Sequence, residues 1–475
     1  TPFELASDVL NCTLILNGAA NVSNQSITRN IQNNFSLSSI AQGTYTWSAS
    51  CIDDDLNTGT NGSHTVFFVD TSVPAVNLHA PAALGNFSVT EVRFNYTPVD
   101  NMDVNLTCNL TIGNSVNVSG AESENGTHSN LTVTGFNDGV HLWNVTCIDN
   151  SSNFNVSVTR SFTVDTVYPV VTLTTPADNS WSANSGLDFN YTPADTNIKS
   201  CGLYGNFSGP WVSQAIDLSV QTGIENNFSA FSLKDGTFGW NVNCTDHSGN
   251  YNFSASNFTV NVDTAFPLLS FTAPTPSNDT NQSITDFIIN VTHFDNNSGS
   301  VTIVWNTTLN QTGFFSPALN YTNFTFVSVA DGVYGYYAEA NDSANNLNST
   351  EVRTIRVDTT PAQVHPEFPL NNTWRNNHTN TVLFEYNATD AILKVSNCSL
   401  VINNKVNQTN HTVTESATNN FSQTFAQGNY NWSVNCSDPL NNLNQTPFRL
   451  LKVDQEFPLI SNESINATIS NITGY

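Results

Sequence analysis

The sequence predicts an all-β protein made of tandem β-sandwich domains, and three observations lead to this prediction. Apolar and polar residues alternate in short runs along the chain, as they do in strands that have one buried face. A Val-Asp segment followed by proline recurs at intervals of 95, 98, 95 and 96 residues. Eight cysteines fall into four pairs, each in a different repeat. The length of 475 residues is enough for three to five domains.

The clearest strand lies within residues 235–246, directly after an Asp-Gly turn. We expect this segment to form the central strand of a sandwich, with its aromatic and aliphatic side chains in the core. In this copy the apolar residues alternate with Gly and Asn: Phe238, Trp240, Val242 and Cys244. Similar segments lie at 42–51, 138–147, 331–340 and 427–436.

The joints between repeats divide the chain into domains. Each joint has an aspartate that is followed within four residues by proline: Asp70, Asp165, Asp263, Asp358 and Asp454. The predicted domains are therefore 1–70, 71–165, 166–263, 264–358 and 359–454, followed by a tail at 455–475. A period near 95 residues with closely spaced short strands is typical of immunoglobulin-like sandwiches. We expect five such domains, the first of them incomplete.

The cysteine pairs predict one disulfide in each of four domains. The two cysteines of a pair are 39, 39, 43 and 38 residues apart, which is too far for a zinc cluster. Since the second cysteine lies on the inward face of the central strand, we expect bridges between the two sheets; reduced core thiols are the alternative. Disulfides indicate an oxidising, extracellular compartment. The expected bonds are Cys12–Cys51, Cys108–Cys147, Cys201–Cys244 and Cys398–Cys436.

The fourth domain, residues 264–358, departs from this pattern. Ala340 stands where the second cysteine is expected, and residues 301–304 replace the strand of the first cysteine. Packing can compensate for a missing disulfide. We therefore expect the same fold in this domain, with an apolar contact between Ala and Val in place of the bridge.

Short motifs connect the repeats to a known group of proteins. In the second repeat, an Asp-Gly pair at 138–139 precedes the central strand, Asp149 and Asn153 follow it, and residues 162–169 read Phe-Thr-Val-Asp-Thr-Val-Tyr-Pro. Residues 245–250, Thr-Asp-His-Ser-Gly-Asn, are the third repeat's version of the middle motif. These motifs resemble the prokaryotic Ig-like repeats of large bacterial and archaeal surface proteins and adhesins. The resemblance covers all five repeats and implies their fold, but stalks, spacers and binding modules share it.

The two ends of the chain read as incomplete repeats that complement each other. The first repeat begins eleven residues before Cys12 and lacks the opening strand and most of the second, whereas the tail has no central strand. Placed end to end, they recreate the Tyr-Thr-Pro of 96–98 and 191–193. We expect the tail to supply the opening strands of the first repeat in the next copy. The expected contact residues are Pro458, Leu459, Ile460, Tyr475, Thr1 and Pro2.

Two questions about these ends stay open from the sequence. Fragment ends without structural meaning are the alternative to strand exchange. Successive copies can also be one continuous polypeptide or separate docked subunits. In either case the predicted partner of the chain is another copy of itself.

The polarity of the chain comes from Asn, Ser and Thr rather than from charge. The net charge is −26, yet only 11% of residues are charged, and the 12 basic residues form no run. This argues against binding to nucleic acid or to an anionic membrane surface. Acidic proteins adapted to high salt usually carry far more Asp and Glu.

The sequence contains 44 Asn-x-Ser/Thr sequons, many at outward-facing strand positions. Chance in an Asn-rich chain is the alternative, but glycans would solvate these strands in place of the scarce Lys and Glu. Heavy N-glycosylation with prokaryotic-type repeats points to an archaeal surface protein. The expected sites include Asn11, Asn34, Asn61, Asn86, Asn125, Asn144, Asn206, Asn227, Asn243, Asn278, Asn306, Asn341, Asn371, Asn407, Asn431, Asn435 and Asn462.

Aspartates recur at a second position, two residues after the second cysteine or its replacement: Asp53, Asp149, Asp246, Asp342 and Asp438. Together with the joint aspartates they suggest Ca²⁺, which needs six to eight oxygen ligands. Turn capping by the same side chains is the alternative. One or two carboxylates per joint are few, so we expect no metal or other cofactor and keep calcium at the joints as the secondary hypothesis.

The sequence carries no catalytic motif of the His-Glu-x-x-His, Gly-x-Ser-x-Gly or phosphate-loop type. It has no apolar run of the length that predicts a transmembrane helix, and no signal peptide is expected. We predict a non-enzymatic subunit of an extracellular, N-glycosylated cell-surface filament or stalk, assembled head-to-tail by strand complementation. The alternative is an adhesin or lectin-like arm that recognises a host or a polysaccharide.

Overall fold

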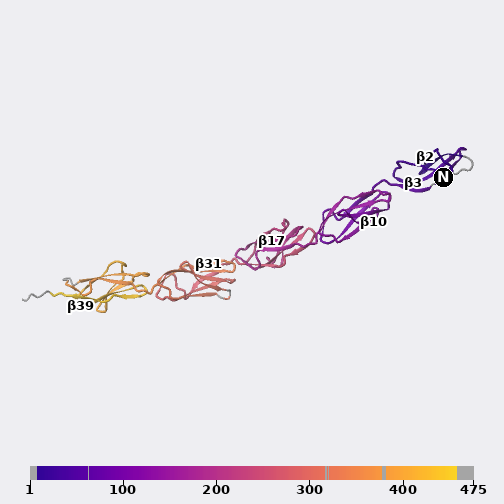
Figure 1. The fold of residues 1–475 in the computed structure, drawn as a ribbon. Coiled ribbons are helices and arrows are strands. Elements are labelled where there is room, and N and C mark those ends of the chain that lie inside the picture. Colours follow the sequence, from indigo (N-terminus) through magenta and orange to yellow (C-terminus); the bar gives the residue numbers. More distant parts are fainter. Residues whose placement is uncertain (1–7, 63, 316–317, 319, 377–380, 457–475) are drawn as a thin grey trace, which may run out of the picture. The chain divides into compact units, whose positions relative to one another are not determined.

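The computed structural model describes residues 8–62, 64–315, 318, 320–376 and 381–456. Within these ranges every regular element is a β-strand, so the chain is all-β, as predicted (Figure 1). Nothing in these ranges is a helix that could span a membrane. The residues group into two compact bodies that divide within the third repeat. Each body is described by itself below.

In the first body, the described part of the first repeat forms a single sheet. Its strand order is β2-β1-β3-β4, and β5 also pairs with β3, the predicted central strand. Residues 25–42, between β2 and β3, contain no strand. The strands are β1 (Val9–Leu16), β2 (Ala19–Asn24), β3 (Gly43–Asp53), β4 (Thr58–Thr60) and β5 (His64–Val69).

The second repeat is a sandwich of two sheets. One has the order β11-β8-β6, and the other has the order β10-β9-β12-β14-β7, with β13 also paired to β12. Only β14 and β7 run parallel among these described pairs. The strands are β6 (Ala75–Ala80), β7 (Gly85–Phe87), β8 (Glu91–Val99), β9 (Asn105–Ile112), β10 (Ser115–Glu124), β11 (Ser129–Thr134), β12 (Gly139–Ile148), β13 (Phe154–Val156) and β14 (Arg160–Val164).

The third repeat has the same succession of strands along the chain. In the first body, β15, β17 and β20 form one sheet, and β18 pairs with both β19 and β21; in the second body, β16 pairs with β23 in parallel. The strands are β15 (Val170–Thr175), β16 (Ser180–Ser182), β17 (Gly186–Ala194), β18 (Ile198–Gly205), β19 (Val212–Asp217), β20 (Asn226–Ser232), β21 (Gly236–Asp246), β22 (Tyr251–Phe253) and β23 (Phe258–Val262).

The fourth repeat lies in the second body and again has two sheets. Their orders are β24-β26-β29 and β25-β32-β30-β27-β28, with β31 also paired to β30. The strands are β24 (Leu268–Thr272), β25 (Thr280–Gln282), β26 (Phe287–Phe294), β27 (Gly299–Trp305), β28 (Thr308–Phe315), β29 (Tyr321–Phe326), β30 (Gly332–Asp342), β31 (Leu347–Ser349) and β32 (Arg353–Val357).

The fifth repeat, also in the second body, has the sheet orders β33-β35-β38 and β34-β41-β39-β36-β37, with β40 paired to β39. The strands are β33 (Gln363–Phe368), β34 (Thr373–Arg375), β35 (Thr381–Thr389), β36 (Asn397–Ile402), β37 (Lys405–Asn410), β38 (Asn419–Thr424), β39 (Gly428–Ser437), β40 (Leu443–Gln445) and β41 (Arg449–Val453). The fold class is therefore a repeated immunoglobulin-like sandwich, as predicted.

The central strands carry the largest side chains of the cores. Trp143, Trp240 and Trp432 are at most 1% exposed. Each meets a phenylalanine of the facing sheet edge-on, with ring centroids 4.9–5.0 Å apart. Because aromatic side chains bury large areas, these contacts supply much of the free energy that holds the two sheets together.

The structure contains the four predicted disulfides, but their predicted position between two sheets is wrong. In each pair the cysteines are direct partners on adjacent antiparallel strands, with Cα atoms 4.0–4.1 Å apart. The bridges therefore lie within one sheet. The reason is that the strand of the first cysteine pairs with the central strand, while the facing strand β8 presents Phe94 and Tyr96 to the core.

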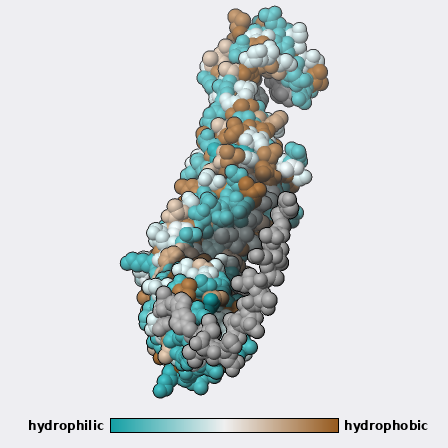
Figure 2. All heavy atoms as spheres, turned by 90° about the vertical axis from the view of Figure 1, so that its left-hand side faces the viewer, coloured by the Kyte–Doolittle hydropathy of each residue, from teal (hydrophilic) through white to brown (hydrophobic). Residues whose placement is uncertain are grey.

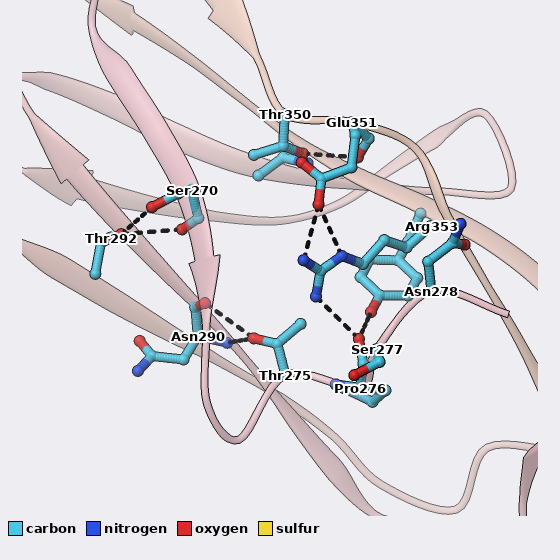
Figure 3. A network of polar contacts seen from close by, with 12 residues as sticks. Ser270, Thr275, Pro276, Ser277, Asn278, Asn290, Thr292, Thr350, Glu351 and Arg353 are labelled. Atoms are coloured by element: carbon cyan, nitrogen blue, oxygen red, sulfur yellow. Dashed lines mark hydrogen bonds and ion pairs between the residues drawn. The ribbon is translucent and has the colours of Figure 1, made fainter. Parts of the chain in front are cut away.

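The fourth repeat keeps the fold without a disulfide. Val301 and Ala340 are direct partners across β27 and β30 and are both buried, which is the expected apolar contact. A polar network adds to this packing (Figure 3). Arg353 and the Tyr336 hydroxyl both donate to the carbonyl oxygen of Pro276, at 3.1 and 2.8 Å. These bonds tie β30 and β32 to the segment between β24 and β25.

Candidate functional site

The inward face of the first repeat's sheet borders a cleft of about 760 Å³. Strands β1 and β3 form one side of the cleft, and residues 25–42 contribute to the other. The apolar side chains of its lining include Leu14, Leu16, Ile27, Phe35, Leu37 and Trp47. Polar residues, among them Gln32, Asn33 and Asn61, complete the lining. Apolar side chains that border an open cleft mark a place where further protein can be buried.

The same face is closed in the second repeat. Trp143, at the position of Trp47, is 1% exposed, whereas Trp47 is only half-buried. In the second repeat, β11 has the position of residues 25–42 and pairs only with β8. The described part of the first repeat has no counterpart of β8. Within the part of the chain that the structure describes, residues 25–42 therefore have no strand to pair with, and the cleft borders them.

The tail that is predicted to fill this cleft is described only as far as residue 456. The predicted inter-subunit residues and the sequon Asn462 lie outside the described residues: Pro458, Leu459, Ile460, Tyr475, Thr1 and Pro2. The structure therefore describes only the acceptor surface of the predicted contact.

Three carboxylates meet at each of four joints. In every cluster, one oxygen from each carboxylate lies within 4.8 Å of those from the other two. Each cluster combines a joint aspartate with two aspartates of the repeat that follows, and each lies within one body. The clusters are Asp70, Asp100 and Asp103; Asp165, Asp195 and Asp246; Asp263, Asp295 and Asp342; and Asp358, Asp390 and Asp438.

Sequence reasoning missed one member of three clusters and two members of the first. It identifies the joint aspartates and, in three clusters, those that follow the central strand, but not the aspartates directly after β8, β17, β26 and β35: Asp100, Asp195, Asp295 and Asp390. In the first cluster Asp103, which the sequence analysis also missed, is the third member, and Asp149 is not part of it. A signal exists in two repeats, where Thr-Pro-x-Asp occurs at 97–100 and 192–195. The expectation of one or two carboxylates per joint is therefore wrong, because three come together.

Burial and neighbouring charges raise the pKa of one aspartate in three of the four clusters. Asp358 is fully buried, and this burial, followed by the charges of Asp390 and Asp438, raises its pKa to about 6. Burial, together with neighbouring aspartates, also raises the pKa of Asp195 and of Asp295. Three carboxylates this close repel one another unless a proton or a cation lies between them.

The donor set of a cluster suits a hard divalent cation. All the ligand atoms are oxygens, which favour Ca²⁺ or Mg²⁺ over Zn²⁺. Oδ1 of Asp358 accepts the backbone N–H of Thr360 at 3.1 Å, so this oxygen caps the turn. Oδ2 of Asp358 is buried without a hydrogen-bond partner among the described residues. One side chain thus serves the capping role and still has an oxygen for a ligand.

An asparagine fastens each complete repeat to the joint before it. Asn250 donates its backbone N–H to Oδ1 of Asp246 at 2.9 Å and an Nδ2–H to Oδ2 at 2.7 Å. Its Nδ2 also donates to the main-chain carbonyl of Asp165, at 2.8 Å. We call this set of three bonds the joint latch. Three other asparagines, Asn153, Asn346 and Asn442, make it to the carbonyls of Asp70, Asp263 and Asp358.

The expected glycosylation sites within the described residues are all exposed or half-buried. On the face seen in Figure 2, hydrophilic residues are interspersed with hydrophobic ones. Asn125 differs in its bonding, because its Nδ2 donates to the carbonyls of Asp100 and Asp103, both at 2.6 Å. A glycan replaces one N–H of the amide, so glycosylation of Asn125 would break one of these bonds.

Comparisons with known proteins find similar structures at low sequence identity. No protein-family model and no curated protein sequence matches the chain. A crystal structure of the tetra-tandem repeat in the extending region of a large adhesion protein is 17% identical, covering 81% of this chain and 100% of that chain, with a TM-score of 0.31. A structure concerning host cell surface retention of a 1.5-MDa bacterial ice-binding adhesin is 15% identical, covering 61% and 100%, with a TM-score of 0.29.

The fibronectin(III)-like modules of Clostridium thermocellum CbhA are 16% identical, covering 40% of this chain and 94% of that chain, with a TM-score of 0.23. At such identities and TM-scores, the likeness carries no argument about what this chain does.

Proposed function

We propose that this chain is a non-enzymatic structural subunit of an extracellular filament or stalk, in which the tail of one copy completes the first repeat of the next. The observation that carries the proposal is the inward face of the first repeat, which the described residues cover only in part and which borders a cleft of about 760 Å³. Four disulfides and no free cysteine are typical of proteins that work outside the cell.

Strand addition meets two needs of the first repeat. An added strand would pair with the backbone of residues 25–42, as β8 pairs with β11 in the second repeat. It would also cover the apolar face. In the second repeat this cover comes from Val92, Phe94 and Tyr96, each at most 1% exposed. Full burial of one large apolar side chain stabilises by roughly 1.5–3 kcal/mol.

The tail sequence contains a pattern suited to this role. Ile465, Ala467 and Ile469 alternate with polar residues, as in a strand with one buried face. A register that aligned Tyr475 with Tyr96 would bring polar residues of the tail to the neighbouring buried positions. We therefore favour the register in which the two isoleucines point into the cleft.

The contact is heterologous, because the tail of one copy meets the first repeat of another. Such a contact does not have to close on itself, and repeated use of it produces an open filament. The same geometry applies whether the subunits are separate chains or sections of a longer polypeptide.

Deletion of residues 455–475 tests the proposal. We expect the full chain to form polymers in sedimentation and electron microscopy, and the deletion variant to stay monomeric. The double variant Ile465→Ser/Ile469→Ser is expected to weaken polymerisation, whereas Thr468→Ser, on the opposite face of the strand, leaves it unchanged. If the deletion variant forms filaments with the native spacing, the tail is not the connector, and a binding arm becomes the better description.

We further propose that the exposed sequons carry N-glycans. The observation that supports this is their position at exposed or half-buried sites of a strand-rich surface with few charges. The mass of the protein isolated from its native source should exceed the 51.6 kDa of the bare chain by the combined mass of many glycans. A mass close to 51.6 kDa would refute it.

A second proposed function is Ca²⁺ binding at the joints. The observation that favours it is the fully buried Asp358, whose Oδ2 has no hydrogen-bond partner among the described residues and which lies beside Asp390 and Asp438. Titration with Ca²⁺ is expected to raise the unfolding temperature of the wild-type chain, and a chelator to lower it again. Asp358→Asn should lose most of the shift contributed by its joint. If Ca²⁺ does not change the unfolding temperature of the wild-type chain, the site is excluded.

A further inference from the structure

The first repeat carries one half of a joint latch. Asn57 donates its backbone N–H to Oδ1 of Asp53 at 2.7 Å and an Nδ2–H to Oδ2 at 3.0 Å, as Asn250 does with Asp246. Asn57 is exposed, however, whereas Asn250 is only 4% exposed. No joint aspartate precedes Asn57 in the part of the chain that the structure describes, so the third bond of the latch is missing there.

The other half lies at the end of the fifth repeat. Asp454 donates its N–H to the carbonyl of Arg375 at 3.0 Å, and its Oδ1 accepts the N–H of Glu456 at 3.1 Å. The same two bonds fix Asp358, whose N–H donates to a carbonyl at 3.0 Å and whose Oδ1 accepts an N–H at 3.1 Å. The main chain of Asp454 is thus arranged like that of a working joint, and no asparagine among the described residues reaches its carbonyl.

We propose that Asn57 of one copy donates its Nδ2–H to the main-chain carbonyl of Asp454 in the copy whose tail fills its cleft. The inference rests on the proposed strand complementation and names the contact that sets its register. Asp53 and Asn57 line the cleft themselves. The tail begins directly after Asp454, so a tail in the cleft brings this carbonyl toward Asn57. The joint between two copies then has the same latch as the joints within one copy.

The test compares Asn57→Ala with Asn442→Ala in the full chain. Asn57→Ala removes the latch between copies, and we expect the dissociation constant for polymerisation to rise about 5- to 10-fold, the effect of one lost hydrogen bond. Asn442→Ala removes the same latch at an internal joint and is expected to leave that constant unchanged. Protease resistance of the first repeat in dilute monomer shows whether Asn57→Ala still folds.

A second variant tests proximity without changing Asn57. Thr58→Cys combined with Gln455→Cys should give a ladder of covalent oligomers under oxidising conditions, and Lys405→Cys combined with Gln455→Cys should not. If the tail deletion abolishes polymerisation but a folded Asn57→Ala variant polymerises normally, or the ladder is absent, the latch is wrong and strand complementation stands. If the tail deletion has no effect, strand complementation itself fails.

Discussion

The first and second repeats each contain a sheet built around a central strand. In the second repeat another sheet packs on it, whereas the described part of the first repeat has no second sheet. In both, a disulfide joins the same two neighbouring strands over a separation of 39 residues. Yet Trp143 is 1% exposed, while Trp47 is half-buried beside a cleft. The disulfide therefore fixes the pairing of two strands but does not close the core.

The fourth repeat supports this conclusion, because its core is closed although it has no disulfide. It has both sheets and no disulfide, and Tyr336, at the position of the tryptophans, is fully buried. The facing sheet thus closes a core with or without the bridge. What the first repeat lacks in the described residues is apolar cover, and this is the physical reason to expect a partner strand.

The largest difference in stability between the first and second repeats is expected when their disulfides are removed. Opening a loop of about 40 residues costs roughly 4 kcal/mol in the chain-entropy model. We expect Cys12→Ala/Cys51→Ala to unfold the first repeat of the monomer, because one sheet has little buried area in reserve. Cys108→Ala/Cys147→Ala should leave the second repeat folded at a lower unfolding temperature. Limited proteolysis with mass mapping distinguishes them, and equal resistance of the two would break the comparison.

Truncation of the core tryptophan should also affect the two repeats unequally, but by a smaller amount than removal of the disulfides. Trp143→Ala leaves a cavity in a closed core and should cost about 3–5 kcal/mol. Trp47→Ala, in the half-covered repeat, should cost less than half of that in the monomer. Hydrogen exchange read by mass spectrometry reports the stability of each repeat separately. In the polymer the cost of Trp47→Ala is expected to approach that of Trp143→Ala, and a constant cost would argue against a covering strand.

The acidic joints provide a pH test that compares a complete joint with the open end. Because the pKa of Asp358 is raised to about 6 from an ordinary value of 3.8, the folded state binds more protons between these values. Protonation of Asp358 therefore stabilises the folded state. This stabilisation is fully present below pH 3.8 and is lost as the pH rises through about 6. In chelator, we expect the unfolding temperature of the fourth and fifth repeats to fall by about 5 °C over this range.

Asp358→Asn should reduce that pH dependence and leave the part contributed by Asp295, whose pKa is also raised by burial. Asp454→Asn, at the open end, serves as its control. Added Ca²⁺ is expected to flatten the pH dependence of the wild-type chain, because a cation replaces the proton between the carboxylates. A pH dependence as large in Asp358→Asn as in the wild-type chain would place its origin elsewhere.

The smallest expected effect concerns two sequons, one in each of the compared repeats. Asn125→Ala breaks internal hydrogen bonds and should destabilise the second repeat by roughly 1–3 kcal/mol. Asn34→Ala, at an exposed position, should change stability by less than about 0.5 kcal/mol. Glycopeptide mapping should find Asn34 modified and Asn125 unmodified. A fully occupied Asn125 would show that its hydrogen bonds do not form before glycosylation.

Much of the architecture followed from the sequence alone. Period-two alternation located the central strands, and the cysteine spacing gave the correct pairs. The replacement of a disulfide by Val301 and Ala340 was also readable. These features are local or strictly periodic, and a local pattern reports directly which face of a strand is buried.

The tertiary structure decided which segments lie side by side. It placed the disulfides within one sheet, because strand order depends on topology and not on the face of each strand. It also brought three carboxylates together at four joints and carried the amide of Asn250 to the carbonyl of Asp165, 85 residues away. Contacts over such distances in the chain arise only when two sheets pack and fix the loops at their ends, so no run of neighbouring residues encodes them.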